Sequence, residues 1–369
     1  MKQSISDNKN KIMLSNMQSD KRNDGNYVET VRGPMRMSKL GTTLTHEYLI
    51  CDFSNLYVPP FYVNSYDFTA SSLKNLGYVR QYPYSYLENL RLNDVEGITA
   101  VFKEVDLFKR SYGGTIVDKS SCLNRNISVL KSLSDTTDVN IIIGTGYNIP
   151  DAPNLLSTKT TEEMYNDIQD EMENGCKTER SVKPAFIAEG GDIILDFEIR
   201  ALRAMALYQG QFRCPVSFHP GKYVIPLTEI MRIYQEAGGR ATELVIAHID
   251  RSIGTENIME FIEKNQCYIQ FDQFGVDTPF YQLNPRTDIM SDTQKIQLIA
   301  MMKAEGKLHR VLMSHDIHTK HRMVTFGGLG YVHISHNVTP LMLKRDFTLD
   351  DIYLIRNENP YRWLNRLNL

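Results

Sequence analysis

Five residues of the kinds that bind metal ions and move protons recur along this chain. His46, Glu189, His219, His248 and Asp316 each stand at or near the end of a different short apolar segment. One such residue by itself is more often structural. Five in the same register on five segments predict a metal site, and imidazoles with carboxylates suit zinc or a similar divalent ion, with manganese, cobalt and nickel as alternatives.

The chemistry of such a site is hydrolysis. A glutamate that bridges two ions holds them roughly 3.5–4 Å apart, the spacing of two-metal hydrolases, and a hydroxide between the ions is then the nucleophile. Asp316, with one oxygen on a metal and one free, could take the proton from that hydroxide and pass it to the leaving group. The substrate bond would be an amide, ester, lactone or phosphoester.

The elements that carry these residues alternate between strands and helices. Continuous apolar runs, typical of buried parallel strands, occupy residues 42–50, 113–118, 140–147, 185–191, 214–219, 243–250, 267–272 and 310–316. Amphipathic segments at 161–175, 228–241 and 292–307 predict helices, the last with an aspartate cap at Asp292. Eight such repeats predict an α/β fold, the (β/α)8 TIM barrel, whose active site lies at the C-terminal ends of the strands.

Strand parity narrows the set of residues that converge. His46 and Tyr48 are two apart and share a face, whereas His315 and Asp316 are neighbours, so only one of them faces the barrel interior. His318 lies beyond its strand and could reach the site only through the loop. The predicted cluster is three histidines, Glu189 and Asp316, together with Tyr48.

One barrel accounts for most of the chain. Residues 1–26 are polar and predict a disordered tail, and residues 27–369 predict a single metallohydrolase barrel. The segment from about 54 to 112 is long for one strand-to-helix connection. It predicts extra helix and loop at the mouth of the barrel, where substrates are met.

The composition limits the classes of binding partner that we expect. The 369 residues are 42% apolar and 23% charged with a net charge of −3, as in soluble globular proteins, which gives no general reason to expect nucleic acid or a membrane as partner. No run approaches the roughly 20 apolar residues that cross a bilayer, and the N-terminus has no signal-type core. We expect a cytosolic protein with reduced cysteines and a small-molecule substrate, and leave homo-oligomerisation open.

Several motifs resemble those of one enzyme family. "ETVRGPMRMSKLGTTLTHEYL" resembles the opening of phosphotriesterase-family barrels, which usually contains G-x-T-L-x-H-E-H. "CPVSFHPG", "VIAHIDRS", "SHDIHTKHRMVTFGGLGYVHI" and "NENPYRWL" follow the family in the same order. "SHDIHTK", "YQLNP" and "YSYLENLRLN" resemble its animal branch. The resemblance covers about Tyr27 to the C-terminus.

The resemblance implies a TIM barrel with two divalent cations. His46 and Asp316 would belong to the more buried ion, and His219 and His248 to the more exposed one. Glu189 would bridge the ions where phosphotriesterases proper have a carboxylated lysine, which argues against organophosphates as the native substrates.

The chain departs from the family at Tyr48, where the usual residue is histidine. Three interpretations remain open: Tyr48 ligates as tyrosinate; the buried site fills with His46, Glu189, Asp316 and water; or the protein holds one ion or none and has kept only a binding role. The expectation is therefore two cations, most simply zinc, or one if Tyr48 does not ligate.

Substrate residues are indicated by position alone. Lys222 and Arg251 follow strand ends and could meet an anionic group, although surface ion pairing explains them equally well. Tyr147 and Asp272 end strands and could line the pocket, and the glycines at 327–331 invite a phosphate-binding interpretation, although tight turns use glycine more often. The animal branch is linked to N-acyl amino acids such as N-acetyltaurine. We therefore expect a small anionic N-acyl amide, with a lactone or phosphoester as the alternative.

Overall fold

The computed structural model describes residues 27–60, 73–120, 125–147, 158–191, 195–221, 226–254, 257–276 and 278–365. The N-terminal tail predicted for residues 1–26 and the candidate Lys222 lie outside these ranges. Glu189 is described by its backbone only.

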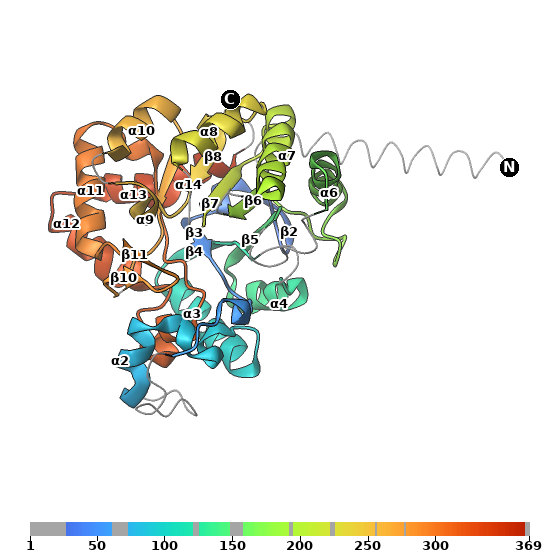
Figure 1. The fold of residues 1–369 in the computed structure, drawn as a ribbon. Helices are drawn as coiled ribbons and strands as arrows, with labels where there is room; N and C mark the ends of the chain where they lie inside the picture. Colours follow the sequence, from blue (N-terminus) through green and yellow to red (C-terminus); the bar gives the residue numbers. More distant parts are fainter. Residues whose placement is uncertain are drawn as a thin grey trace.

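Eight parallel strands form one sheet, in which spatial order follows chain order (Figure 1). The sequence therefore predicted the TIM barrel and its eight strands correctly. They are β3 (Thr42–Glu47), β4 (Gly113–Asp118), β5 (Asn140–Thr145), β6 (Phe186–Gly191), β7 (Val216–Pro220), β8 (Leu244–Ile246), β9 (Tyr268–Phe271) and β12 (Val311–Met313).

The barrel is closed between its last and first strands by bonds just beyond β12. The backbone N–H of Asp316 donates to the carbonyl of His46 at 3.1 Å, and that of Tyr48 donates to Ile317 at 3.2 Å. The hydroxyl of Ser314 accepts the N–H of His46 at 3.0 Å. These bonds join the two ends of the sheet directly beside two of the candidate site residues.

Helices surround the strands, and they are α3 (Val95–Arg110), α4 (Ile127–Thr137), α6 (Thr161–Asn174), α7 (Asp196–Phe212), α8 (Leu227–Glu236), α10 (Ile258–Asn265) and α11 (Asp292–Ala304). Three short helices follow near the C-terminus: α12 (Thr339–Leu343), α13 (Leu349–Tyr353) and α14 (Asn359–Leu364). Among the described residues, no helix is long and apolar enough to cross a membrane.

Two details of the predicted helices were wrong. Helix α11 is capped by Ser291, whose hydroxyl accepts the N–H of Gln294 in a capping box, and not by Asp292. Asp292 instead bonds the imidazole of His333. Helix α8 ends at Glu236 because the next turn contains Gly238 at φ +94°, a conformation that stops a helix.

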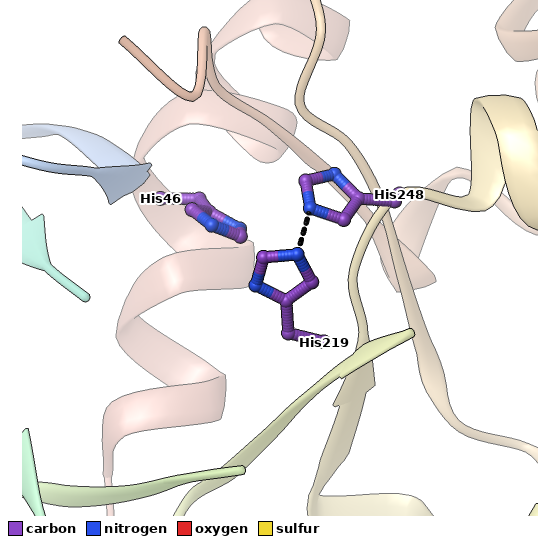
Figure 2. Close-up of side chains that lie close together, drawn as sticks. All are labelled: His46, His219 and His248. Atoms are coloured by element: carbon purple, nitrogen blue, oxygen red, sulfur yellow. Dashed lines mark hydrogen bonds between the residues drawn. The ribbon is translucent and has the colours of Figure 1, made fainter. Parts of the chain in front are cut away.

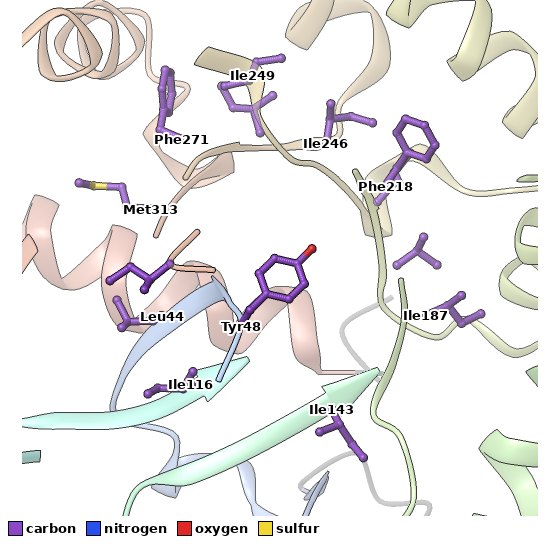
Figure 3. Close-up of a cluster of buried hydrophobic side chains, with 14 of the residues drawn as sticks. Leu44, Tyr48, Ile116, Ile143, Ile187, Phe218, Ile246, Ile249, Phe271 and Met313 are labelled. Carbon is purple, nitrogen blue, oxygen red and sulfur yellow. The ribbon is translucent and has the colours of Figure 1, made fainter. Parts of the chain in front are cut away.

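Apolar side chains fill two separate regions. One layer lies between the strands and the helices, and Figure 3 shows Phe218 and Ile187 in it, directed away from the space that the strands enclose. The other fills the floor of the barrel around Val117, Phe186 and Trp363. The Trp363 indole on α14 donates to the carbonyl of Val216 at 3.2 Å and so ties the C-terminal helix to the floor.

Two excursions stand at the other end of the barrel. The first lies between β3 and α3 and includes α2 (Leu73–Gln81) and the short turns η3 (Pro83–Ser85) and η4 (Leu87–Leu90). The second is the hairpin β10 (Phe280–Tyr281) and β11 (Asn284–Asp288). The Gln282 side chain accepts the N–H of Tyr84 at 2.9 Å and donates to Ser85 at 2.8 Å, which joins the excursions.

Candidate metal centre

Three imidazoles meet where the strands end. His46 comes from β3, His219 from β7 and His248 from the residue that begins helix α9 (Ile249–Ser252). Their potential ligand atoms lie within 4.8 Å of one another, and the Nε2 atoms of His219 and His248 are 2.6 Å apart (Figure 2). The geometry therefore brings together the three histidines that the sequence singled out.

The backbone is bent to place these side chains. A bulge between Leu44 and Glu47 in β3 shifts the register with β4 around His46. His248 and Asp316 both adopt the left-handed conformation, with φ of +52° and +55°. Non-glycine residues reach this conformation at a cost of about 1–2 kcal/mol. Strain of this kind gathers at functional sites, and here it falls on two candidate ligands.

Asp272 lies beneath the imidazoles and holds two of them. Its oxygens are 2.8 Å from Nδ1 of His46 and 2.5 Å from Nδ1 of His248. Burial opposes ionisation of Asp272, but His248 and His46 outweigh it and hold the pKa of this carboxyl well below its usual range. An ionised carboxylate only accepts, so both Nδ1 atoms donate a proton to it, and Nε2 of the neutral His248 keeps a lone pair.

Burial keeps the imidazoles of His219 and His248 neutral. It lowers the pKa of His248 to about 4, with the Arg251 charge adding to the effect. Burial and the neighbouring His248 lower the pKa of His219 well below its ordinary value. Neutral imidazole is the form that binds metal ions, so these two residues need not lose a proton at neutral pH before they ligate.

Asp316 faces the histidines from the open side. Its carboxylate oxygens are 3.7 Å from Nε2 of His46 and 4.0 Å from Nε2 of His248. Burial raises the pKa of Asp316, but His318, His248 and His46 together bring it below its usual value. Nε2 of His46 and Oδ1 of Asp316 are buried and have no hydrogen-bond partner in the described part of the chain.

These observations fit a divalent cation. Unpaired buried polar atoms cost roughly 1–3 kcal/mol each, and a cation would satisfy both atoms at once. The donors are neutral imidazole nitrogens and an ionised carboxylate, a set that zinc prefers. Glu189 lies in β6 with its backbone paired to Phe218, and its bridging role stays a prediction because its side chain is not described.

Tyr48 points into the barrel interior, as Figure 3 shows. Its ring is buried, with 3% of its surface exposed, and its hydroxyl lies 3.4 Å from Nδ1 of His219. The hydroxyl of Tyr331 donates to its carbonyl at 3.1 Å. Tyr48 therefore stands against the imidazole edge that faces away from His248.

A pocket of about 190 Å³ opens above Asp316. Its walls come from the first excursion between β3 and α3, from the β10–β11 hairpin and the residues before it, and from the loop after β12. The lining includes Arg80, Tyr84, Val276, Tyr281, His318 and Arg322. The Tyr84 hydroxyl lies 2.9 Å from Nε2 of His318, whose Nδ1 is 3.3 Å from Asp316. Sequence reasoning missed Tyr84, and the only hint was the aromatic run "YPYSY" inside the segment expected at the mouth.

Arg251 lies beside this pocket. Its guanidinium stacks 4.5 Å from the ring centroid of Tyr281, and its charge acts on Asp316 and Tyr84. One Nη atom donates to the carbonyl of Pro220 at 3.4 Å, whereas Nε has no hydrogen-bond partner within the described residues. Burial opposes the charge, but Tyr281 and Asp316 raise the pKa of Arg251 overall, so the cation persists.

The other candidates from the sequence lie elsewhere. The hydroxyl of Tyr147 donates to Asp167 on α6 at 2.6 Å, outside the histidine cluster. Asp272 is fully buried and engaged by the two imidazoles, so it supports the cluster from below and does not line the described pocket. In the glycine run, a Cβ on Gly328 would meet the backbone of Arg322 at 2.2 Å, which accounts for that glycine by a tight turn.

Comparison with known proteins extends what the geometry shows. The profile of the phosphotriesterase family matches residues 26–364. The chain belongs to that family. Phosphotriesterase-related proteins of Drosophila melanogaster and Drosophila mojavensis are 41% and 40% identical to it over 344 and 349 residues, which cover 91% and 92% of this chain and 98% of each relative.

Solved structures agree on the fold. A resiniferatoxin-binding protein from Rhodobacter sphaeroides superposes with a TM-score of 0.85 at 23% identity, covering 92% of this chain and 95% of that one. A lactonase from Listeria monocytogenes gives 0.71 at 19% identity, covering 92% and 98%. The phosphotriesterase family consists of metal-dependent hydrolases, and membership places this chain among them.

Proposed function

We propose that this phosphotriesterase-family protein hydrolyses a small anionic N-acyl amino acid amide, with N-acetyltaurine as the reference substrate. The observation that carries the proposal is the placement of Asp316 on the pocket wall and of the Arg251 guanidinium, which has no carboxylate partner among the described residues, against the pocket residue Tyr281. In the proposed complex, Asp316 would transfer protons at the scissile amide, and Arg251 would bind the anionic tail of the substrate.

The residues that would hold the metal follow the sequence prediction. In the two-ion arrangement that the family resemblance implies, His219, His248 and Glu189 would hold one ion, and His46, Glu189 and Asp316, with or without Tyr48, the other. Zinc is the proposed ion because neutral imidazoles and carboxylates suit it. A bound ion lowers the pKa of its water towards neutrality and polarises the bond under attack.

The chain's own groups divide the remaining work. Asp316 is ionised at neutral pH, so it can accept the proton of the attacking water and deliver it to the amine nitrogen as the C–N bond breaks. Arg251 would bind the sulfonate or carboxylate of the substrate. Asp272 keeps His46 and His248 in the tautomer that offers Nε2. A further contact from Lys222 stays a prediction.

The test is a substrate panel with purified protein loaded with zinc or manganese. We expect release of free amine from N-acetyltaurine and related N-acetyl amino acids, and none from neutral N-acetylamines. Turnover confined to sugar lactones or phosphoesters would replace the amide with the alternative substrate class. Metal-loaded protein that binds the anionic amides without cleaving any compound of the panel would favour the rival, a non-catalytic binding barrel.

We also propose a cytosolic location. Cys51, Cys176, Cys214 and Cys267 are buried free thiols, which agrees with a reducing compartment. Fractionation of cells that express the tagged full chain tests this, and recovery in a secreted or organellar fraction would contradict it.

A further inference from the structure

We propose that the metal centre of this chain is a three-histidine site for one tightly held ion, and that Tyr48 orients His219 instead of ligating. The inference rests on the proposed function only in assuming that the site binds a metal ion. It concerns the choice left open at position 48, where the resemblance to the family motif implies histidine and this chain has tyrosine.

The first argument is the position of the phenol. The Tyr48 hydroxyl faces Nδ1 of His219 at 3.4 Å, whereas Nε2 of the same ring faces His248 at 2.6 Å. The two nitrogens lie on different edges of an imidazole, and their lone pairs point apart. An ion on the Nε2 edge of His219 is therefore on the side that the phenol does not face.

The second argument is a consistent chain of hydrogen bonds. The proton on Nδ1 of His248 goes to Asp272, so Nε2 of His248 accepts, and Nε2 of His219 must donate to it. His219 then accepts at Nδ1, where the Tyr48 hydroxyl is the donor. The negative charge of Asp272 anchors this chain of hydrogen bonds at its end.

The same phenol also serves the metal-bound form. When Nε2 of His219 binds an ion, the ring proton moves to Nδ1 and needs an acceptor. A hydroxyl both donates and accepts, so Tyr48 meets either requirement without moving. A histidine that ligates a metal ion through one ring nitrogen normally donates its other ring N–H to a nearby acceptor. That hydrogen bond fixes the orientation of the ring and tunes the metal affinity.

The third argument is the donor set. The ligand atoms of His46, His219 and His248 lie within 4.8 Å of one another, and the Asp316 carboxylate stands 3.7 and 4.0 Å from Nε2 of His46 and His248 on the pocket side. Three histidines with a fourth position open to substrate are an established arrangement for catalytic zinc.

The experiment measures zinc per chain by elemental analysis after chelator treatment and reloading, with affinity from competition against a chromogenic chelator. Wild type should hold one tight ion. Tyr48→Phe should still hold one, with roughly 10- to 100-fold weaker affinity, the usual cost of losing a partner behind a ligand. Tyr48→His restores the second imidazole of the family motif and should take up a second ion.

Tyr234→Phe is the matched control, because Tyr234 is a buried tyrosine on α8 whose hydroxyl has no hydrogen-bond partner in the described residues. It should leave stoichiometry and affinity unchanged. Two tight ions in wild type, or loss of the ion in Tyr48→Phe with the fold retained by circular dichroism, would overturn the inference.

Spectra of protein loaded with iron(III) give a second readout, since tyrosinate bound to iron(III) produces a visible charge-transfer band. We expect no charge-transfer band that depends on Tyr48. A band that is present in wild type and absent from Tyr48→Phe would show that Tyr48 ligates the ion. Neither measurement uses substrate. A one-ion protein without hydrolytic activity would thus refute the proposed function and leave the inference standing, whereas an active two-ion protein would do the reverse.

Discussion

Asp272 accepts hydrogen bonds from both the backbone and the side chain of His248. Its carboxylate accepts the backbone N–H of His248 at 3.1–3.2 Å and its Nδ1 proton at 2.5 Å. The backbone contact stabilises the left-handed conformation at His248, and the side-chain contact sets the tautomer. One carboxylate therefore fixes both where the imidazole stands and which nitrogen it offers.

Asp272→Asn should weaken metal binding more than it weakens the fold. The amide loses the negative charge that fixes the Nδ1 protons of His46 and His248, so we expect roughly a 10- to 100-fold loss of zinc affinity. Competition with a chromogenic chelator measures the zinc affinity. Unchanged affinity in folded Asp272→Asn would show that the tautomers are set elsewhere.

Asp316→Asn should lose turnover. An amide at this position cannot accept the proton of the attacking water, and general acid–base groups contribute roughly 10²–10⁴-fold. We expect kcat to fall by about that factor, while circular dichroism and the thermal midpoint show a folded protein. A variant with near wild-type kcat at saturating zinc would exclude Asp316 as the proton-transfer group.

Arg251→Met should discriminate between anionic and neutral substrates. A hydrogen bond to a charged group contributes about 1.5–3 kcal/mol, so loss of the guanidinium should lower kcat/KM for the anionic amide roughly 10- to 100-fold. Weak hydrolysis of a neutral analogue should be unaffected, and Arg251→Lys should recover part of the loss. An equal loss on both substrates would assign Arg251 to support of the α9 helix that follows His248.

The metal-free protein should lose stability as the pH falls from about 6.5. His219, His248 and His315 all have pKa values below the ordinary range, mainly because of burial. Between their unfolded and folded pKa values the unfolded chain binds more protons, so each favours unfolding by up to about 1.4 kcal/mol per pH unit. For His248 this window runs from about 6.5 to about 4.

Glu47 acts in the opposite direction. Burial raises its pKa to about 7, so between about 4.5 and 7 the folded state holds the extra proton and gains stability as the pH falls. His321, whose pKa burial also lowers, adds to the histidines, and Asp250, whose pKa burial raises to about 7, adds to Glu47. We expect the histidines to outweigh the carboxyls, which leaves a net loss of stability towards acid. Urea unfolding of chelator-treated protein at pH 7.5 and 5.5 measures it, and greater stability at pH 5.5 would show that the histidines titrate normally.

The fold could be predicted because buried parallel strands leave a plain trace in sequence. Each of the eight strands is a continuous apolar run, and His46, His219, His248 and Asp316 converge because parallel strands all end at the same side of a barrel. The same rule does not bring Tyr147 to the histidine cluster. It ends its strand as expected, but its hydroxyl turns outwards to Asp167 on α6.

The pocket wall could not be predicted for a physical reason. Tyr84 lies against His318 because Gln282 holds the first excursion to the β10–β11 hairpin. No local sequence pattern encodes a contact between segments so far apart in the chain. Asp272 was placed on the correct face of its strand, but depth within the barrel decides whether such a residue meets substrate or supports its neighbours.

The hydrogen bond from the N–H of Asp316 to the carbonyl of His46 has a consequence for biosynthesis. It joins the first strand of the barrel to the segment that follows the last, so His46 and Asp316 cannot meet until all eight barrel strands have been made. A chain that stops before the last barrel strand would lack the complete set of donors, and full metal uptake then reports that the barrel has closed.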